Sequence, residues 1–217
     1  MTPGCETPDL GPYARAMIRQ LIWNYKQARK MRQWQAAGRP IPMPGVAKRA
    51  MLRETALRHK LTVFVETGTH RGETPWVLKD VFERIYTIEI EPAKVDAAKH
   101  KFARHPHVEC LLGDSGKVLP QVLAKLNKPA LFWLDGHFMD EHSGDPNDPT
   151  PVAAEVRMVL DHPVRGHVIL IDDARLFGTP GYPTLDAVRG EVERRRPDLA
   201  WSVELDVIRL VPRAGEQ

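Results

Sequence analysis

Residues 61–92 read LTVFVETGTHRGETPWVLKDVFERIYTIEIEP, and this stretch decides the fold. It opens with a β-branched and aromatic run over residues 62–65, which is typical of a buried strand. A turn with two glycines follows, and the apolar spacing beyond it predicts a helix over residues 73–84. A second strand is predicted over residues 85–90, and acidic residues mark its end. The pattern indicates a β-α-β unit that binds the ribose of a nucleotide-like cofactor.

The charge of the turn indicates which cofactor this unit binds. A dinucleotide site needs the spacing G-x-G-x-x-G, in which backbone amides hold an anionic pyrophosphate. Here Gly68 and Gly72 are spaced G-x-x-x-G, and Glu66 stands at the end of the first strand. A carboxylate at this position repels a pyrophosphate but suits an ammonium or sulfonium group. S-adenosylmethionine (SAM) carries both of these cations and no phosphate.

The E-x-G-x-x-x-G turn and the acidic strand end TIEIEP resemble motif I and the acidic end of the second strand in class I SAM-dependent methyltransferases. The resemblance covers about residues 46–212. It includes the segments GDSGKVLP, FWLDGHF, HVILIDDARLFG and GYPTL, which look like those of a group of bacterial class I methyltransferases. The alternative is a β-α-β unit whose glycines serve only the turn.

Length and composition limit the number of domains that the chain can form. The chain has 217 residues, of which 42% are hydrophobic and 27% charged, so it can build one domain with an appendage. We expect residues 1–45 to form a basic helix with a proline-rich linker, and residues 46–217 to form the methyltransferase domain. Cys5 and Cys110 provide neither a disulfide framework nor a metal knuckle. The cysteine pattern fits a reducing cytosol, so we expect a cytoplasmic protein. We expect no signal peptide and no membrane span.

Charge is distributed unevenly along the chain. Residues 1–60 carry 12 Lys and Arg against 3 Asp and Glu, whereas residues 61–217 carry 19 against 25. A nucleic-acid-binding protein usually lines its working face with Lys and Arg. The predicted catalytic body is mildly acidic, so we expect no nucleic-acid partner. A nucleic-acid methyltransferase that uses the basic front segment is an alternative, although the sequence has no N/D-P-P-[YFW] motif for base amines.

The front of the chain is predicted to form a helix over residues 12–37, followed by a linker at residues 38–45 with three alternating prolines. We expect the apolar stripe of this helix to pack on the domain or on a second subunit, as a homodimer contact. A basic amphipathic helix on a membrane surface is the alternative. The stripe consists of Tyr13, Met17, Leu21, Tyr25 and Ala28.

The rest of the chain alternates between helices and strands, which predicts an α/β protein with a doubly wound, mostly parallel sheet of seven strands. This is a Rossmann-like methyltransferase fold. The other helices of the domain are predicted over residues 46–59, 92–104, 117–126, 151–160 and 184–195. The further strands are predicted over residues 108–112, 130–134, 168–171, 201–205 and 207–211, the last two as an antiparallel pair. A polar loop over residues 138–149 is predicted to be a lid or an acceptor loop.

Acidic residues stand at five predicted strand ends. In an open parallel sheet, ligands bind at the carboxyl ends of the strands, so these side chains are expected to converge on one site. The acids are Glu66, Glu89, Asp114, Asp135 and the pair Asp172 and Asp173.

With SAM as the cofactor, each part of the site has an expected role. The backbone at Gly68 and Gly72 would approach the methionine portion, and Glu66 would lie near its cationic end. Glu89 would accept hydrogen bonds from both ribose hydroxyls, since a carboxylate offers two oxygens. Asp114 would accept a hydrogen bond from the adenine amino group. The other predicted cofactor contacts come from Thr69, His70, Thr74, Ser115 and Asp135.

The resemblance also implies a metal. More distantly, the chain is similar to catechol O-methyltransferase and to macrolide-sugar O-methyltransferases, in which acids after the fourth and fifth strands hold magnesium. The matching positions are Asp135, Asp172 and Asp173, and such a carboxylate set suits a hard cation. The ion would orient an acceptor hydroxyl and lower its pKa. In the alternative, Asp135 contacts cofactor and acceptor directly, the acidic pair caps a helix or binds Arg175, and His137 is the catalytic base.

These features favour a SAM-dependent methyltransferase that acts on a hydroxyl oxygen of a small molecule or a sugar. A nicotinamide-dependent oxidoreductase on the same kind of sheet is the first alternative, and the missing second glycine argues against it. A non-enzymatic binding module with this fold is the second alternative. That module would be expected to lose strand-end acids, and none of the expected ones is lost.

Overall fold

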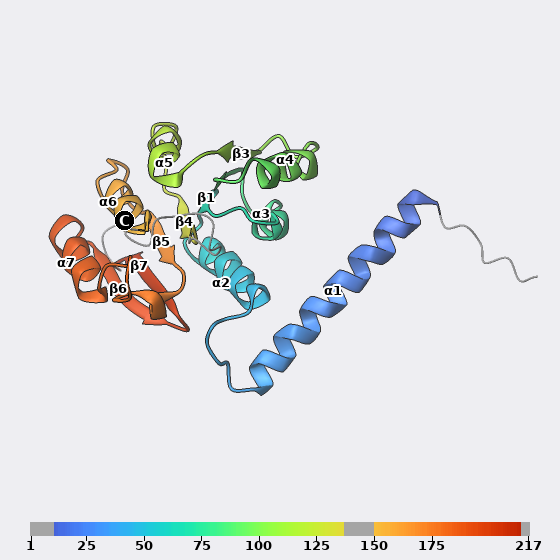
Figure 1. The fold of residues 1–217 in the computed structure, drawn as a ribbon, viewed down its shortest axis with the longest axis horizontal. Helices are drawn as coiled ribbons and strands as arrows, with labels where there is room; N and C mark the ends of the chain where they lie inside the picture. Colours follow the sequence, from blue (N-terminus) through green and yellow to red (C-terminus); the bar gives the residue numbers. More distant parts are fainter. Residues whose placement is uncertain (1–10, 137–149, 214–217) are drawn as a thin grey trace, which may run out of the picture.

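A single sheet of seven strands forms the centre of the protein. The computed structural model describes residues 11–136 and 150–213. The strands run in the order β3-β2-β1-β4-β5-β7-β6 (Figure 1). β1 to β5 are parallel to one another, and β7 lies antiparallel between β5 and β6. The strands are β1 (Val63–Thr67), β2 (Arg84–Glu89), β3 (Val108–Leu112), β4 (Leu131–Leu134), β5 (Val168–Ile171), β6 (Leu199–Glu204) and β7 (Val207–Pro212).

This topology confirms the predicted doubly wound, mostly parallel sheet of seven strands. The dinucleotide-binding fold has the parallel order 3-2-1-4-5-6, whereas here an antiparallel strand is inserted beside β5. The final hairpin turns at Leu205 and Asp206, whose φ angles of 51° and 70° are positive. Two central residues with positive φ match the twist of the flanking strands in a two-residue hairpin. The predicted edge pair is therefore confirmed, and its turn is located.

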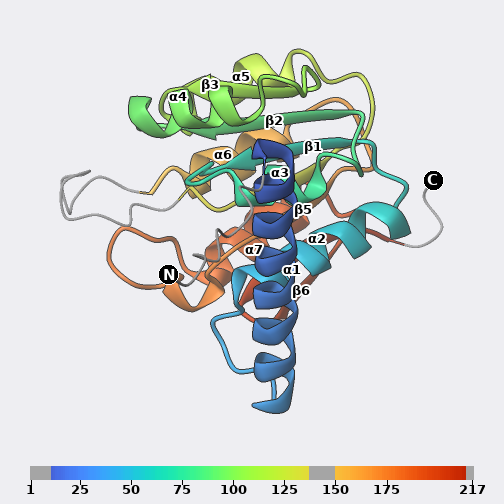
Figure 2. The same ribbon diagram turned by 90° about the vertical axis from the view of Figure 1, so that its right-hand side faces the viewer.

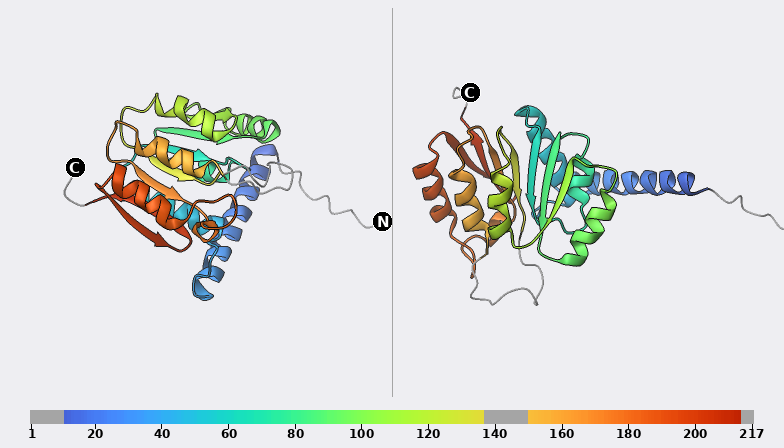
Figure 3. Two further views of the ribbon diagram at one scale, coloured as in Figure 1. Left: turned by 60° about the vertical axis from the view of Figure 1, so that its left-hand side comes forward. Right: turned by 90° about the horizontal axis from the view of Figure 1, so that it is seen from above.

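Two layers of helices cover the sheet (Figure 3). One layer packs around Val65, Phe132 and Ile169, and it contains α5 (Ser115–Leu123), α6 (Val152–Leu160) and α7 (Leu185–Arg195). The other packs around Phe64, Trp133 and Leu170, and it contains α2 (Gly45–Arg58), α3 (Glu73–Leu78) and α4 (Pro92–Lys101). Successive residues of β1, β4 and β5 alternate between the two layers, as the period of a strand requires. The short helix η1 (Ala174–Leu176) follows β5.

The helix predicted over residues 73–84 is too long. α3 ends at Leu78, and Arg84 already pairs with Val63 at the start of β2. The backbone N–H groups of Glu83 and Arg84 donate to the carbonyl of Thr62, at 2.9 and 3.3 Å. These two amides therefore start the parallel ladder and cannot continue a helix.

α1 (Pro12–Ala36) projects from the domain as a rod (Figures 1 and 2). The prediction that its stripe packs on the domain is wrong, because Met17, Leu21 and Tyr25 are 52%, 63% and 64% exposed. A second stripe faces the domain instead, and its side chains are Trp23, Gln27, Met31 and Trp34. Both stripes have helical spacing, so periodicity alone could not choose between them.

None of the helices in the two described ranges is both long and apolar enough to cross a lipid bilayer.

Candidate functional site

A cavity of about 650 Å³ opens at the carboxyl ends of the parallel strands. It is lined by residues that follow β1, β2, β3, β4 and β5, and by the first turns of α2. The expected convergence of strand-end acids is observed for Glu89, Asp114, Asp135 and Asp173, which all line this cavity. The other predicted site residues in its wall are Gly68, Thr69, His70, Thr74 and Ser115.

The glycine turn after β1 lies against the end of β4. Gly68 has a φ of 88°, and a Cβ atom there would lie 2.6 Å from the carbonyl oxygen of Asp135. Gly68 and Thr69 donate their backbone N–H groups to the carbonyl of Ile88, at 2.9 and 3.2 Å. Gly72 has a φ of 61° and precedes α3, so the second glycine serves the turn into the helix. The turn therefore forms a backbone wall between β2 and β4.

Glu89, at the end of β2, is held by three backbone amides. Its Oε2 accepts from the N–H of His70 at 2.7 Å, and its Oε1 accepts from Ile90 and Glu91 at 3.0 and 3.2 Å. A carboxylate has about four acceptor sites on its two oxygens, so one site, on Oε2, is left for a hydrogen bond from a ligand in the cavity. The side chain is therefore oriented before any ligand arrives.

Glu66 lies inside β1 and not in the turn, because β1 extends to Thr67. Its side chain is 1% exposed and does not line the cavity. Thr87 donates to Glu66 at 2.8 Å and contacts Thr69 at 2.6 Å, and Thr74 also hydrogen-bonds to Glu66. Burial raises the pKa of Glu66 to about 8. Glu66 thus supports the turn from beneath, and its expected contact with the cationic end of the cofactor stays a prediction.

Replacing Glu66 with glutamine should change how stability depends on pH. The folded protein keeps the Glu66 proton up to a pKa of about 8, whereas the unfolded chain releases it near the ordinary value of 4.5. Folding therefore loses stability as pH rises through this window and loses no more above it. Between pH 6 and pH 8 the wild type should lose about 2–3 kcal/mol of unfolding free energy relative to Glu66→Gln. Urea titrations at both pH values measure this, and parallel changes in the two proteins would contradict it.

Asp114 and Ser115 form the start of α5, which begins earlier than the predicted residue 117. Asp114 caps the helix by accepting from the N–H of Gly116 at 2.9 Å, and this bond brings residues 115 and 116 into the helix. Asp114 also forms an ion pair with Lys117 at 3.3 Å. Both predicted adenine contacts face the cavity.

Glu155 of α6 is a buried acid that the sequence analysis missed. It lies behind Ser115 and Thr67, both of which hydrogen-bond to it, and burial raises its pKa to about 7. Its Oε1 has no hydrogen-bond partner within the described ranges. A single glutamate on the apolar face of a short helix was the available signal.

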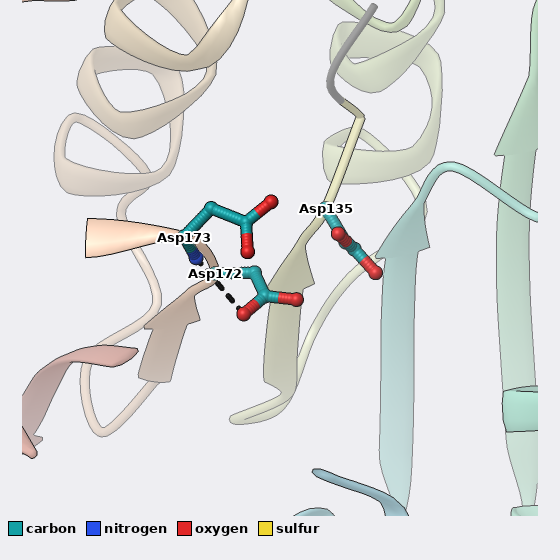
Figure 4. Close-up of side chains that lie close together, drawn as sticks. All are labelled: Asp135, Asp172 and Asp173. Atoms are coloured by element: carbon teal, nitrogen blue, oxygen red, sulfur yellow. Dashed lines mark hydrogen bonds between the residues drawn. The ribbon is translucent and has the colours of Figure 1, made fainter. Parts of the chain in front are cut away.

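Asp135, Asp172 and Asp173 converge, as predicted (Figure 4). One ligand oxygen from each lies within 4.8 Å of the others. Asp172 is fully buried and accepts from the N–H of Asp173 at 2.9 Å, and Asp173 pairs with Arg175 at 2.7 Å. The pairing with Arg175 agrees with the metal-free alternative. Burial raises the pKa of Asp135, the charge of Asp172 raises it further, and Lys48 opposes both.

Lys48 of α2 enters this acidic cluster, and the sequence analysis did not include it. Its ammonium contacts Asp172 directly and lies 3.8 Å from Asp173. Burial lowers the pKa of Lys48, but the charge of Asp172 and the hydrogen bond to it outweigh burial, so the pKa is raised overall. An ammonium group therefore stands where the resemblance implies a magnesium ion. The residues, as folded, do not fit the ion.

Arg49 is a further residue of the site that the sequence analysis missed. It is buried, lines the cavity and pairs with Glu73 at 3.1 Å. Gln27 of α1 accepts from it at 3.0 Å, and the ring of Trp23 lies 5.9 Å from its guanidinium. α1 is therefore connected to the wall of the cavity through one arginine. Two adjacent cations ahead of the first strand were the only signal in the sequence.

His137 and the predicted loop over residues 138–149 lie outside the described residues.

Comparison with known proteins supports the fold. No family model matches the chain, and no curated protein matches its sequence. The SAH-bound methyltransferase PaMTH1 of Podospora anserina is similar at 14% identity and a TM-score of 0.56, covering 97% of this chain and 100% of that chain. The O-methyltransferase TomG of Streptomyces achromogenes, in complex with SAM, matches at 18% identity and a TM-score of 0.54, with coverages of 86% and 89%.

The 23S rRNA methyltransferase ErmE is also similar, at 20% identity and a TM-score of 0.51, with coverages of 77% and 68%. At these identities the likeness concerns the fold. The chain has the class I methyltransferase fold that the sequence predicted.

Proposed function

We propose that this protein is a SAM-dependent methyltransferase that methylates a hydroxyl oxygen of a small molecule or a sugar. The observation that carries the proposal is Glu89, a carboxylate fixed by three backbone amides at the end of β2 in the wall of the cavity. Its remaining acceptor site, on Oε2, suits a hydroxyl of a ribose. The cavity, at about 650 Å³, has the size of a small-molecule site.

The cofactor would lie across the ends of β1, β2 and β3. Asp114 and Ser115 would receive its adenine, and the turn after Gly68 would contact its methionine portion. Arg49 is buried beside this turn and suits the methionine carboxylate, because a guanidinium binds carboxylates with parallel hydrogen bonds. The methyl group would then point towards Asp135 and the end of β5.

SAM, when bound, supplies an electrophilic methyl group, and the electron pair of the broken carbon–sulfur bond stays on sulfur as the acceptor oxygen is methylated. The proton of the acceptor hydroxyl needs a base. Burial raises the pKa of Asp135, which makes its carboxylate a stronger base than an exposed aspartate. We assign this role to Asp135, whereas the sequence predicts His137 as the base of a site without metal.

The sequence also predicts a magnesium ion held by Asp135, Asp172 and Asp173. Such an ion would orient the acceptor oxygen and stabilise its negative charge. Lys48 holds the same position in the fold, so the reaction proposed here uses only residues of the chain.

The exposed stripe of α1 remains a proposed homodimer contact. Light scattering of the full chain should then give a dimer mass, and Leu21→Glu should give a monomer, because Leu21 is 63% exposed at the centre of the stripe. A monomeric wild type would contradict this contact. The cytoplasmic location remains a prediction from the cysteine pattern.

Calorimetric titration with SAM, S-adenosylhomocysteine and NADH, side by side, tests the proposed function. We expect the first two to bind and NADH not to bind. Binding of NADH alone would overturn the proposal in favour of an oxidoreductase. Transfer of a labelled methyl group from SAM to phenols and sugars, compared with total RNA, then separates a small-molecule enzyme from an RNA enzyme. Binding of SAM without any transfer would favour a binding module.

A further inference from the structure

Lys48 is the one lysine whose contacts lie among the three converging aspartates of the described residues. We propose that Lys48 is the built-in cation of the acceptor site, and that its ammonium group excludes a divalent metal ion from Asp135, Asp172 and Asp173. The role of Lys48 in the reaction rests on the proposed function. Its exclusion of metal can be tested without any acceptor.

The position of Lys48 is fixed by the packing of α2. The helix is anchored by Ala47, Met51 and Leu52, which are 4%, 9% and 0% exposed in the core beside the sheet. The Lys48 side chain is 20% exposed, and it reaches Asp172, whose side chain is fully buried. Asp135 also interacts with the charge of Lys48. The charge of Lys48 therefore acts on all three acids.

A magnesium ion would have to displace this ammonium group. Magnesium requires six oxygen ligands at about 2.0–2.1 Å in octahedral geometry. The oxygen of Asp172 that contacts Lys48 would have to exchange partners, and a cation of charge +2 would then lie next to a half-buried ammonium. Repulsion between like charges is strong in such a partly desolvated position. The ion pair is thus the favoured arrangement.

The same contacts give Lys48 a function in the reaction. An ammonium has three N–H donors. Lys48 donates one to Asp172, and Asp173 lies 3.8 Å away as an ion-pair partner. Lys48 also lines the cavity, so another of its donors can reach an acceptor oxygen beside Asp135. Negative charge that develops on this oxygen would be stabilised by a donor that is already in place. Lys48 would then do what the metal is implied to do.

Binding of Mn²⁺, as a probe for divalent ions, tests the exclusion by calorimetry and electron paramagnetic resonance. The wild type should show no saturable site up to about 1 mM Mn²⁺, because Lys48 holds the carboxylates. Lys48→Met should gain one site per chain that binds Mn²⁺ at least 10-fold more tightly than the wild type does. The double variant with Lys48→Met and Asp172→Asn should lose this site again. Lys94→Met is the matched control, since Lys94 also lines the cavity but pairs with Glu91, and it should gain no site.

Two results would overturn the inference. One is a saturable Mn²⁺ site in the wild type that Asp172→Asn removes, and this arm needs no lysine variant. The other is a folded Lys48→Met protein that binds no more Mn²⁺ than the wild type. If Lys48→Met does not fold, Lys48→Gln takes its place with the same expectation. SAM titration of the same wild-type sample tests the proposed function separately. If the wild type did not bind SAM, the proposed function would fail, but the Mn²⁺ result would be unchanged.

Discussion

Replacing Glu89 with alanine is expected to weaken SAM binding at least 10-fold while the fold stays intact. Hydrogen bonds to a charged group are worth about 1.5–3 kcal/mol each, and a ribose hydroxyl would lose the free acceptor site on Oε2. A loss of about 1.5–3 kcal/mol corresponds to a factor of about 10 to 100, since about 1.4 kcal/mol changes affinity tenfold. The amides of His70, Ile90 and Glu91 would lose the carboxylate, but they lie beside an open cavity where water can replace it. Calorimetric titration with SAM measures the effect, and circular dichroism checks the fold.

Glu91→Ala is the matched control for this experiment. Glu91 is two residues further along, lines the same cavity and pairs with Lys94, so its removal changes the net charge equally. Within the described contacts, its carboxylate accepts no bond from the glycine turn, and we expect less than about a threefold change in SAM affinity, in line with the small contribution of exposed ion pairs. Equal losses of SAM affinity in both variants would mean that the negative charge at the rim of the cavity holds SAM, and not the hydrogen bonds of Glu89. Unchanged affinity in Glu89→Ala would mean that the ribose is held elsewhere.

The sheet and its acidic edge could be predicted because both depend on local sequence. Runs of β-branched and aromatic residues mark the strands, and each parallel strand ends at the same edge. An acid directly after such a run must therefore lie near the others, as Glu89, Asp114 and Asp135 do. Glu66 shows the limit of this rule, because β1 ends two residues later than predicted and places that side chain under the turn.

The cations of the site could not be predicted in the same way. Lys48 and Arg49 lie on α2, a helix whose cations are spread around its axis. Which of its cations reaches the sheet edge depends on how α2 packs on the core, and that is a tertiary property. Asp172 shows the same dependence. Its position at the end of β5 was predictable, but its partner lies 124 residues earlier in the chain.

Replacing Gly68 with alanine is expected to disrupt the glycine turn after β1, with at least a 10-fold loss of SAM affinity. Gly68 has a φ of 88°, and the added Cβ would lie 2.6 Å from the carbonyl oxygen of Asp135 and 3.3 Å from the Cα of Gly136. Both neighbours are backbone atoms, so the turn itself has to move away from β4. Left-handed backbone and crowding together should lower the unfolding free energy by about 2–4 kcal/mol.

Gly190→Ala separates this local effect from a general effect of adding a methyl group. Gly190 lies in α7 with nothing within 4 Å of an added Cβ, so alanine there should stabilise the protein by about 0.5–1 kcal/mol through helix propensity. Its SAM affinity should equal that of the wild type. The atoms that the added Cβ would crowd belong to Asp135 and Gly136. The Gly68→Ala variant therefore displaces the glycine turn and the proposed base, Asp135, together. If that variant bound SAM like the wild type, the cofactor could not depend on the close approach of these two strand ends.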